Sequence, residues 1–152
     1  MSDVDTATRT AGPSRASRLA RVRMASFGAV TMLIIEFILG MIYNLYGTAP
    51  TASKSIGLFS SPVLALHVIM SILLLVAAVM LLVRAIGARH RLTIWMSAVG
   101  LAAIIAAGFA GLGFTRNGAV GASLGRSLAF AVSLACYVVI SLAASSPPPS
   151  TP

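Results

Sequence analysis

Long apolar stretches alternate with short polar segments along this chain. Four stretches, at residues 24–46, 62–83, 93–114 and 121–144, each exceed the roughly 20 residues that cross a bilayer as a helix. Because backbone groups in lipid must form hydrogen bonds within the protein, each stretch is predicted to be helical. The connections between them are short, so successive helices run in opposite directions. The pattern therefore predicts an all-α integral membrane protein, an antiparallel bundle of four transmembrane helices.

Composition supports this class and divides the chain into three parts. Of the 152 residues, 58% are hydrophobic and 9% are charged, whereas soluble domains contain roughly 25% charged residues. A single cysteine, Cys136, excludes a disulfide scaffold. We expect a basic N-terminal tail at 1–23, a transmembrane domain at 24–144 and a Pro-rich C-terminal tail at 145–152.

The basic residues predict the orientation in the membrane. The net charge is +8, and the arginines flank apolar stretches, which favours a role in topology over nucleic-acid binding. Lys54 and Arg116 lie on the opposite side from the arginine-rich segments. We therefore expect a cytoplasmic (inner) cell membrane protein with both termini and the middle turn in the cytoplasm, and the Arg, Ala and Gly bias suggests a GC-rich bacterium. The arginines on the predicted cytoplasmic side are Arg9, Arg15, Arg18, Arg21, Arg23, Arg84, Arg89 and Arg91.

Small residues recur at four-residue spacing in the third and fourth stretches. Such rows let helix backbones approach closely in lipid, so they predict a tight pair of neighbouring helices. The rows are Ala103, Ala107 and Gly111 in the third stretch and Gly125, Ala129 and Ser133 in the fourth.

Three ionisable residues fall inside the apolar stretches, where such groups are costly and indicate function by default. Helix rise places Glu36 roughly 15 Å from the outer end of its helix, and His67 roughly 8 Å in from the same side. Gly40, one turn from Glu36, would leave room for the imidazole ring. Arg126 enters from the outer side, and we expect it to form an ion pair with Glu36.

The sequence leaves several interpretations of these groups open. A buried carboxylate can fix helix register without doing chemistry. Tyr43 and Asn44 share a helix face with Glu36, so the same face suits a haem or quinone site. A proton relay would lack an exit to the cytoplasm, because all the polar groups are expected in the outer half. His90, between two arginines of the middle turn, is expected to be a solvated residue.

Residues 33–84 resemble a known family. The segment Leu-Gly-Met-Ile-Tyr-Asn-Leu-Tyr-Gly-Thr (39–48), followed by a loop and by a helix with His67 and Arg84, is similar to one four-helix half of the haem A synthase family. The resemblance implies that His67 is a haem ligand and that Glu36 occupies the family's acidic position.

The sequence departs from this family at three points. The fourth stretch contains no histidine, Val68 stands where the family has arginine, and the loop contains no cysteine. A haem b site would therefore need Met41, Met70 or the His67 of a second copy as the other ligand.

The expected function is that of a non-enzymatic accessory or scaffold subunit of a membrane complex. Its expected partners are membrane lipids and other membrane proteins or a second copy of the chain, not nucleic acid. No catalytic residue, metal site or cofactor is expected under this interpretation. The alternative is a small haem- or quinone-binding redox protein that uses His67, Glu36, Asn44 and Tyr43.

Overall fold

The computed structural model describes residues 15–47, 56–117 and 120–144, which form four helices and no strand. The helices are α1 (Arg15–Tyr46), α2 (Pro62–Ala88), α3 (Arg91–Asn117) and α4 (Val120–Ala143). Each is long and apolar enough to span a membrane. The expected fold class, an all-α four-helix bundle, is confirmed. Residues 1–14 and 145–152 of the expected tails, and Lys54, lie outside the described ranges.

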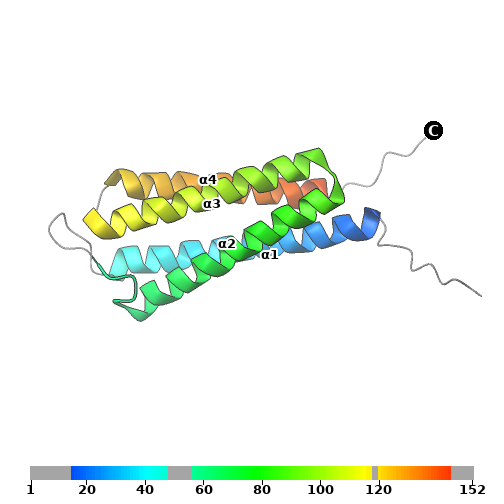
Figure 1. Ribbon diagram of the computed structural model, residues 1–152. Helices are drawn as coiled ribbons and strands as arrows, with labels where there is room; N and C mark the ends of the chain where they lie inside the picture. Colours follow the sequence, from blue (N-terminus) through cyan, green and yellow to red (C-terminus); the bar gives the residue numbers. More distant parts are fainter. Residues whose placement is uncertain (1–14, 48–55, 118–119, 145–152) are drawn as a thin grey trace, which may run out of the picture.

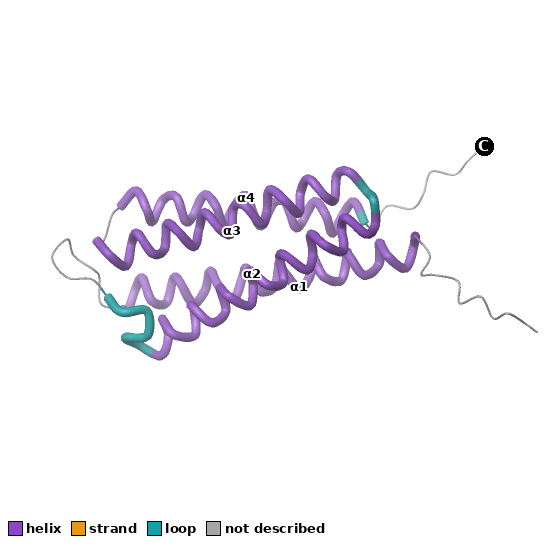
Figure 2. Tube along the Cα trace, viewed as in Figure 1, coloured by secondary structure: helices purple, strands orange, loops and turns teal. Residues whose placement is uncertain are grey.

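Two antiparallel hairpins, α1–α2 and α3–α4, lie alongside each other (Figures 1 and 2). We call the end with Gly47, Ser61 and Thr115 the loop end, and the opposite end, with Arg89 and His90, the turn end. Only Arg89 and His90 separate α2 from α3. Arg89 has a positive φ of 54° and donates its backbone N–H to the Ile86 carbonyl oxygen at 3.0 Å. This left-handed cap ends α2 abruptly, so the chain reverses within two residues.

Local sequence explains the start of α2. The Ser61 side-chain oxygen accepts a hydrogen bond from the Leu64 backbone N–H at 3.2 Å. Pro62 occupies the first helical turn, where its missing N–H leaves no hydrogen bond unmade. At the same end the Ile56 N–H donates to the Thr115 carbonyl oxygen at 3.0 Å, joining the α1–α2 connection to α3.

The closely packed core lies in the half of the bundle nearer the turn end. It contains Val22 and Ala29 of α1, Leu81 of α2, and Tyr137 and Ile140 of α4, each at most 1% exposed. Large apolar side chains cover the outside of all four helices instead of polar ones, as lipid contact requires. The fold is therefore that of a multi-pass membrane protein.

The small residues divide between two roles. On α4, Gly125 and Ser133 face α3: a Cβ on Gly125 would lie 4.0 Å from that of Ala110, and Ser133 Oγ lies 3.4 Å from the Gly100 carbonyl oxygen. Ala107 and Gly111 line a cavity, and a Cβ on Gly111 would meet nothing within 4 Å. The expected contact row on α3 is thus only partly correct, because its Ala107–Gly111 part faces interior space.

Ala103 and Ala129, the remaining members of the two rows, are half-buried. The closest approach of α3 and α4 occurs at Gly100, where a Cβ would lie 2.5 Å from the Tyr137 ring. Gly100 belongs to neither of the two rows of small residues that the sequence predicted as helix contacts.

Candidate functional site

A cavity of about 470 Å³ lies between the helices in the half nearer the loop end. Its volume falls within the range of small-molecule sites. All four helices contribute to its wall, which is mainly apolar, and the rings of Phe37 and Phe130 stack on one another at 4.8 Å along it. Most of its apolar lining comes from leucine, isoleucine and phenylalanine side chains. The cavity therefore suits a largely hydrophobic molecule.

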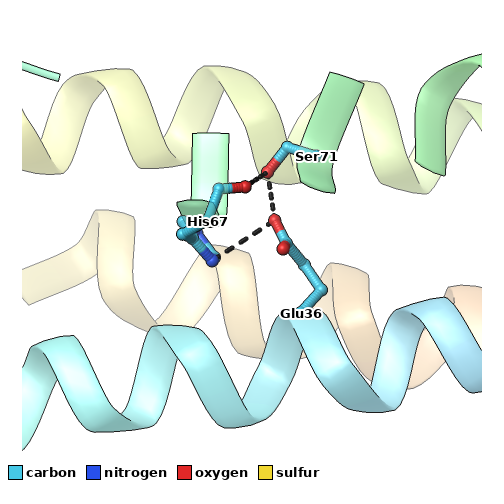
Figure 3. Close-up of polar contacts among 3 residues, drawn as sticks. All are labelled: Glu36, His67 and Ser71. Carbon is cyan, nitrogen blue, oxygen red and sulfur yellow. Dashed lines mark hydrogen bonds and ion pairs between the residues drawn. The ribbon is translucent and has the colours of Figure 1, made fainter. Parts of the chain in front are cut away.

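Three polar side chains meet on this wall (Figure 3). Glu36 of α1 lies beside His67 of α2, with Glu36 Oε1 3.3 Å from His67 Nδ1. The hydroxyl of Ser71 contacts Glu36 Oε1 and also donates to the His67 carbonyl oxygen at 3.0 Å. The side chains of Glu36 and His67 are 12% and 17% exposed. We call these three residues the carboxyl–imidazole cluster.

Gly40 makes room for the cluster. A Cβ at this position would lie 3.3 Å from Cε1 of the His67 ring, closer than ordinary van der Waals contact. The ring can pack against α1 because no side chain stands there. The structure thus places His67 beside Gly40, at the level that helix rise predicted.

Two atoms of the cluster keep unused hydrogen-bonding capacity. Among the residues that the structure describes, Glu36 Oε2 is buried without a hydrogen-bond partner, and the approach of His67 Nδ1 to Glu36 lacks hydrogen-bond geometry. Leaving a buried polar atom unpaired costs about 1–3 kcal/mol. Such atoms on the wall of a cavity are positioned to bind the polar end of a ligand.

Arg126 lies on the same cavity but does not pair with Glu36. Its guanidinium carbon is 5.7 Å from the centre of the Phe114 ring, a cation–π geometry at the end of α3. Within the described part of the chain, the only acidic–basic pair within 4.0 Å is Glu36 with His67. The two side chains do not approach within 4.0 Å, because α2 packs beside α1 at this level and brings His67 to the carboxylate, but the charge of Glu36 still acts on Arg126 across the cavity. Arg126 instead places a positive charge on another wall of the cavity.

The structure separates the other candidate residues. Asn44 lines the cavity two turns beyond Glu36, and Met41 lines it as well. Tyr43 and Met70 are not part of the wall. Met41 is therefore the better placed of the two methionines proposed as a haem ligand. The described residues contain no group of three or more His, Cys, Asp or Glu side chains that could hold a metal ion.

A second set of buried polar residues, which the sequence did not predict apart from the packing role of Ser133, leads from the cavity into the half nearer the turn end. These are hydroxyl side chains at most 1% exposed: Ser26, Thr93, Ser97, Ser133 and Tyr137. The ionisable groups of the predicted site lie toward the loop end, but these hydroxyl residues bring further buried polar groups into the other half of the bundle. A four-residue spacing on two helices, Thr93–Ser97 and Ser133–Tyr137–Ser141, was the available clue.

Comparison of the chain with known protein families, with curated proteins and with solved structures gives no match. The fold and the cavity define its class: a multi-pass, four-helix membrane protein with a carboxyl–imidazole cluster on an interhelical cavity.

Proposed function

We propose that the protein binds a hydrophobic molecule with a polar head group, of the quinone class, in the cavity between its helices. The observation that carries the proposal is the position of the carboxyl–imidazole cluster on an otherwise largely apolar wall. Pockets that bind small molecules combine such walls with a few polar groups that fix the ligand's orientation.

The chemistry of a quinone fits the lining. Its flat ring and isoprenoid tail are apolar, and its carbonyl oxygens accept hydrogen bonds. The imidazole of His67 is a donor on α2, and Arg126 supplies a further, charged donor from α4. Donors on two walls match a molecule with carbonyl groups at opposite edges of its ring.

Haem b is the second candidate ligand, and the position of His67 on the cavity favours it. On the described wall, His67 and Met41 would hold the haem iron through one imidazole and one thioether. The resemblance of residues 33–84 to a half of the haem A synthase family supports the same choice of His67. When bound, haem would supply one-electron chemistry, and Glu36 would orient the imidazole.

Spectroscopy and extraction distinguish these ligands. We would purify the protein in mild detergent, record oxidised and dithionite-reduced absorption spectra, and analyse the organic extract for quinones by mass spectrometry. A Soret band would identify haem, whereas a featureless visible spectrum with an extracted quinone would identify the proposed class. If neither ligand is present after reconstitution with quinone and with haem, the binding proposal fails.

Gly40→Leu tests whether the ligand occupies this cavity. The leucine would enter the space of the His67 ring, so we expect the bound ligand to be lost. Gly28→Leu is the matched control on the same helix, since a Cβ there meets nothing within 4 Å. Ligand retained in Gly40→Leu would place the binding site elsewhere.

An accessory or scaffold role is the other function that an observation favours. Ala102 and Ala106 are exposed on the outer face of α3, one turn apart. Small residues facing lipid allow another helix to approach closely. Under this alternative, Ala106→Leu weakens association with a partner protein, while His67→Ala leaves it unchanged, as measured by co-purification from native membranes.

We further propose that the protein lies in the cytoplasmic membrane of a bacterium with its turn end inside. The turn end carries Arg84, Arg89 and Arg91, and the arginines near the start of α1 are at the same end, whereas Arg116 and Arg126 lie toward the loop end. An excess of arginine marks the cytoplasmic side of a membrane protein.

A further inference from the structure

Four buried hydroxyl residues lead from the side of the cavity that faces the turn end toward that end. Ser133 and Tyr137 belong to α4, and Ser97 and Thr93 belong to α3. Each is at most 1% exposed. We call these four residues the hydroxyl column.

Contacts with Gly100 bring the two helices of the column together. Ser133 lines the cavity, and its Oγ lies 3.4 Å from the Gly100 carbonyl oxygen. One turn further along α4, the Tyr137 ring packs on the same glycine, whose Cβ, if present, would lie 3.2 Å from the tyrosine Oη. Tyr137 can occupy the centre of the bundle because residue 100 has no side chain.

The part of the column farther from the cavity follows α3 to the turn end. Ser97 precedes Gly100 by three residues, which places both on one side of the helix, the side on which Tyr137 packs at Gly100. Thr93 lies a further turn away, and its Oγ1 is 2.8 Å from Nδ1 of His90 in the connection between α2 and α3. Hydroxyl groups thus extend from the cavity to the opposite end of the bundle.

Two members of the column have no hydrogen-bond partner within the described part of the chain: Tyr137 Oη and Ser97 Oγ. Both side chains are completely buried, with 0% exposure. Unpaired hydroxyls are costly inside a membrane bundle, where lipid cannot satisfy them. Buried water is the usual partner of such groups, and each water can bond to several of them.

We propose that the hydroxyl column holds water and conducts protons between the carboxyl–imidazole cluster and His90. A hydroxyl or a water molecule can accept a proton on one side and release another on the opposite side, so the column returns to its starting composition after each transfer. Glu36 and His67 face the cavity end of this path, and His90 lies at its other end. The chain of residues supplies the cytoplasmic exit that the sequence alone did not indicate.

The packing along the path fits protons better than metal cations. A proton passes from one oxygen to the next without an ion moving through the bundle, whereas a sodium or potassium ion would need several oxygen ligands around it at once, and Tyr137 packs directly on Gly100 across the path. Arg89 and Arg91 flank His90, and Arg18 of α1 borders the same pocket as Arg89. These positive charges act on protons and metal cations alike, so they do not select between the two. The proposed path lies between the cavity and the turn end, and it does not depend on which ligand the cavity binds.

Proton flux into vesicles tests the proposal. The full-length protein is reconstituted in liposomes that contain a pH-sensitive dye, and a potassium gradient with valinomycin drives proton entry. We expect wild-type vesicles to acidify faster than protein-free vesicles, with no accompanying sodium uptake. Equal rates in the two preparations would overturn the proposal.

Tyr137→Phe separates conduction from packing, because it removes only the hydroxyl and keeps the ring on Gly100. We expect the flux to fall about tenfold, the effect of one missing hydrogen bond in the path. The melting temperature should stay near that of the wild type, because the ring keeps its packing and no described protein group loses a hydrogen bond. Tyr46→Phe, at an exposed tyrosine of the loop end, is the matched control and should conduct like wild type.

Two results with these variants would contradict a proton path. One is wild-type flux in Tyr137→Phe; the other is a fall in flux of the same size in Tyr46→Phe. If Tyr137→Phe does not fold, Ser97→Ala removes the other unpaired hydroxyl, and we expect the same fall in flux.

Discussion

Ser71 has one hydrogen on its side-chain oxygen and two acceptors within reach, the carboxyl of Glu36 and the carbonyl of His67. Both hydrogen bonds form together only when Glu36 carries a proton and donates it to Ser71, which then donates to the carbonyl oxygen. The single hydrogen of Ser71 therefore cannot serve both acceptors at once. A carboxyl group in this setting is better explained by function than by stability, because an apolar residue would need no partner at all.

Glu36→Gln tests this explanation at the scale of one residue. The amide has the shape of the carboxyl and can donate to Ser71, so we expect the melting temperature to stay near that of the wild type. Glu36→Leu should also fold, with equal or higher stability, because it removes a buried oxygen that has no partner. Thermal unfolding in detergent measures both variants.

A large loss in both variants would contradict the functional explanation. Breaking a required buried ion pair lowers the free energy of unfolding by about 3–5 kcal/mol. That outcome would make the pair of Glu36 with His67 a structural element.

At the scale of the helices, the bundle consists of two hairpins packed in different ways. The α3–α4 hairpin is held by close backbone approach at Gly100, with the Tyr137 ring filling the space that a side chain would take. The α1–α2 hairpin is joined at its centre by the polar contacts of Glu36, His67 and Ser71. The cavity remains where α3 presents small residues, Ala107 and Gly111, to the interior.

Gly100→Ala should disturb the α3–α4 packing. The new methyl group would lie 2.5 Å from the Tyr137 ring, which is completely buried. We expect the free energy of unfolding to fall by about 1–3 kcal/mol, the usual effect of overpacking. Denaturation in detergent followed by circular dichroism gives the value.

Gly108→Ala is the matched control on the same helix. A Cβ there meets nothing within 4 Å. We expect unchanged or slightly increased stability, because alanine favours a helix over glycine by up to about 1 kcal/mol. If the two variants lose the same stability, the close contact at Gly100 does not hold the hairpin together.

The sequence predicted the helices better than it predicted their mutual rotation. Four apolar stretches were enough to define the fold, although α1 begins at Arg15, within the expected tail, and α2 continues to Ala88. Helix rise placed His67 beside Gly40, because depth depends only on counting residues. Which neighbour Glu36 contacts depends on how the helices turn about their axes, and sequence spacing does not fix that rotation.

Hydroxyl residues were the hardest to interpret from the sequence. A serine in a membrane helix can bond to the carbonyl one turn before it, as Ser133 does with Ala129 at 2.8 Å. Such a residue is equally acceptable facing lipid, a helix interface or a polar path. The sequence therefore predicts only helix packing for Ser133, and it indicates no role for Ser97 or Tyr137.

At the scale of the whole molecule, the start of α1 and the end of α4 both lie at the turn end (Figure 1). The cavity is nearer the loop end, and the hydroxyl column lies between the cavity and the turn end. With the proposed orientation, a molecule in the cavity would be closer to the outer surface, and protons would move along the column to or from the cytoplasm.

Cysteine labelling in intact cells tests the proposed orientation. Gly57 at the loop end and Gly87 at the turn end are both exposed, and a Cβ at either meets nothing within 4 Å. We expect a membrane-impermeant maleimide to label Gly57→Cys but not Gly87→Cys until the cells are opened. The native Cys136 is 7% exposed and should stay unlabelled in both. The reverse pattern would invert the proposed topology.

The unequal lengths of the helices determine how deeply the protein sits in a bilayer. α1 has 32 residues and is about 48 Å long, whereas α4 has 24 residues and is about 36 Å long. The hydrocarbon core is only about 30 Å thick, so α1 must tilt or project beyond it. Its arginines are all in its N-terminal part, which makes projection at that end the less costly choice. The vertical position of the protein, and with it the depth of the cavity below the surface, would then be set by the phosphate layer that these arginines reach and not by hydrophobic thickness.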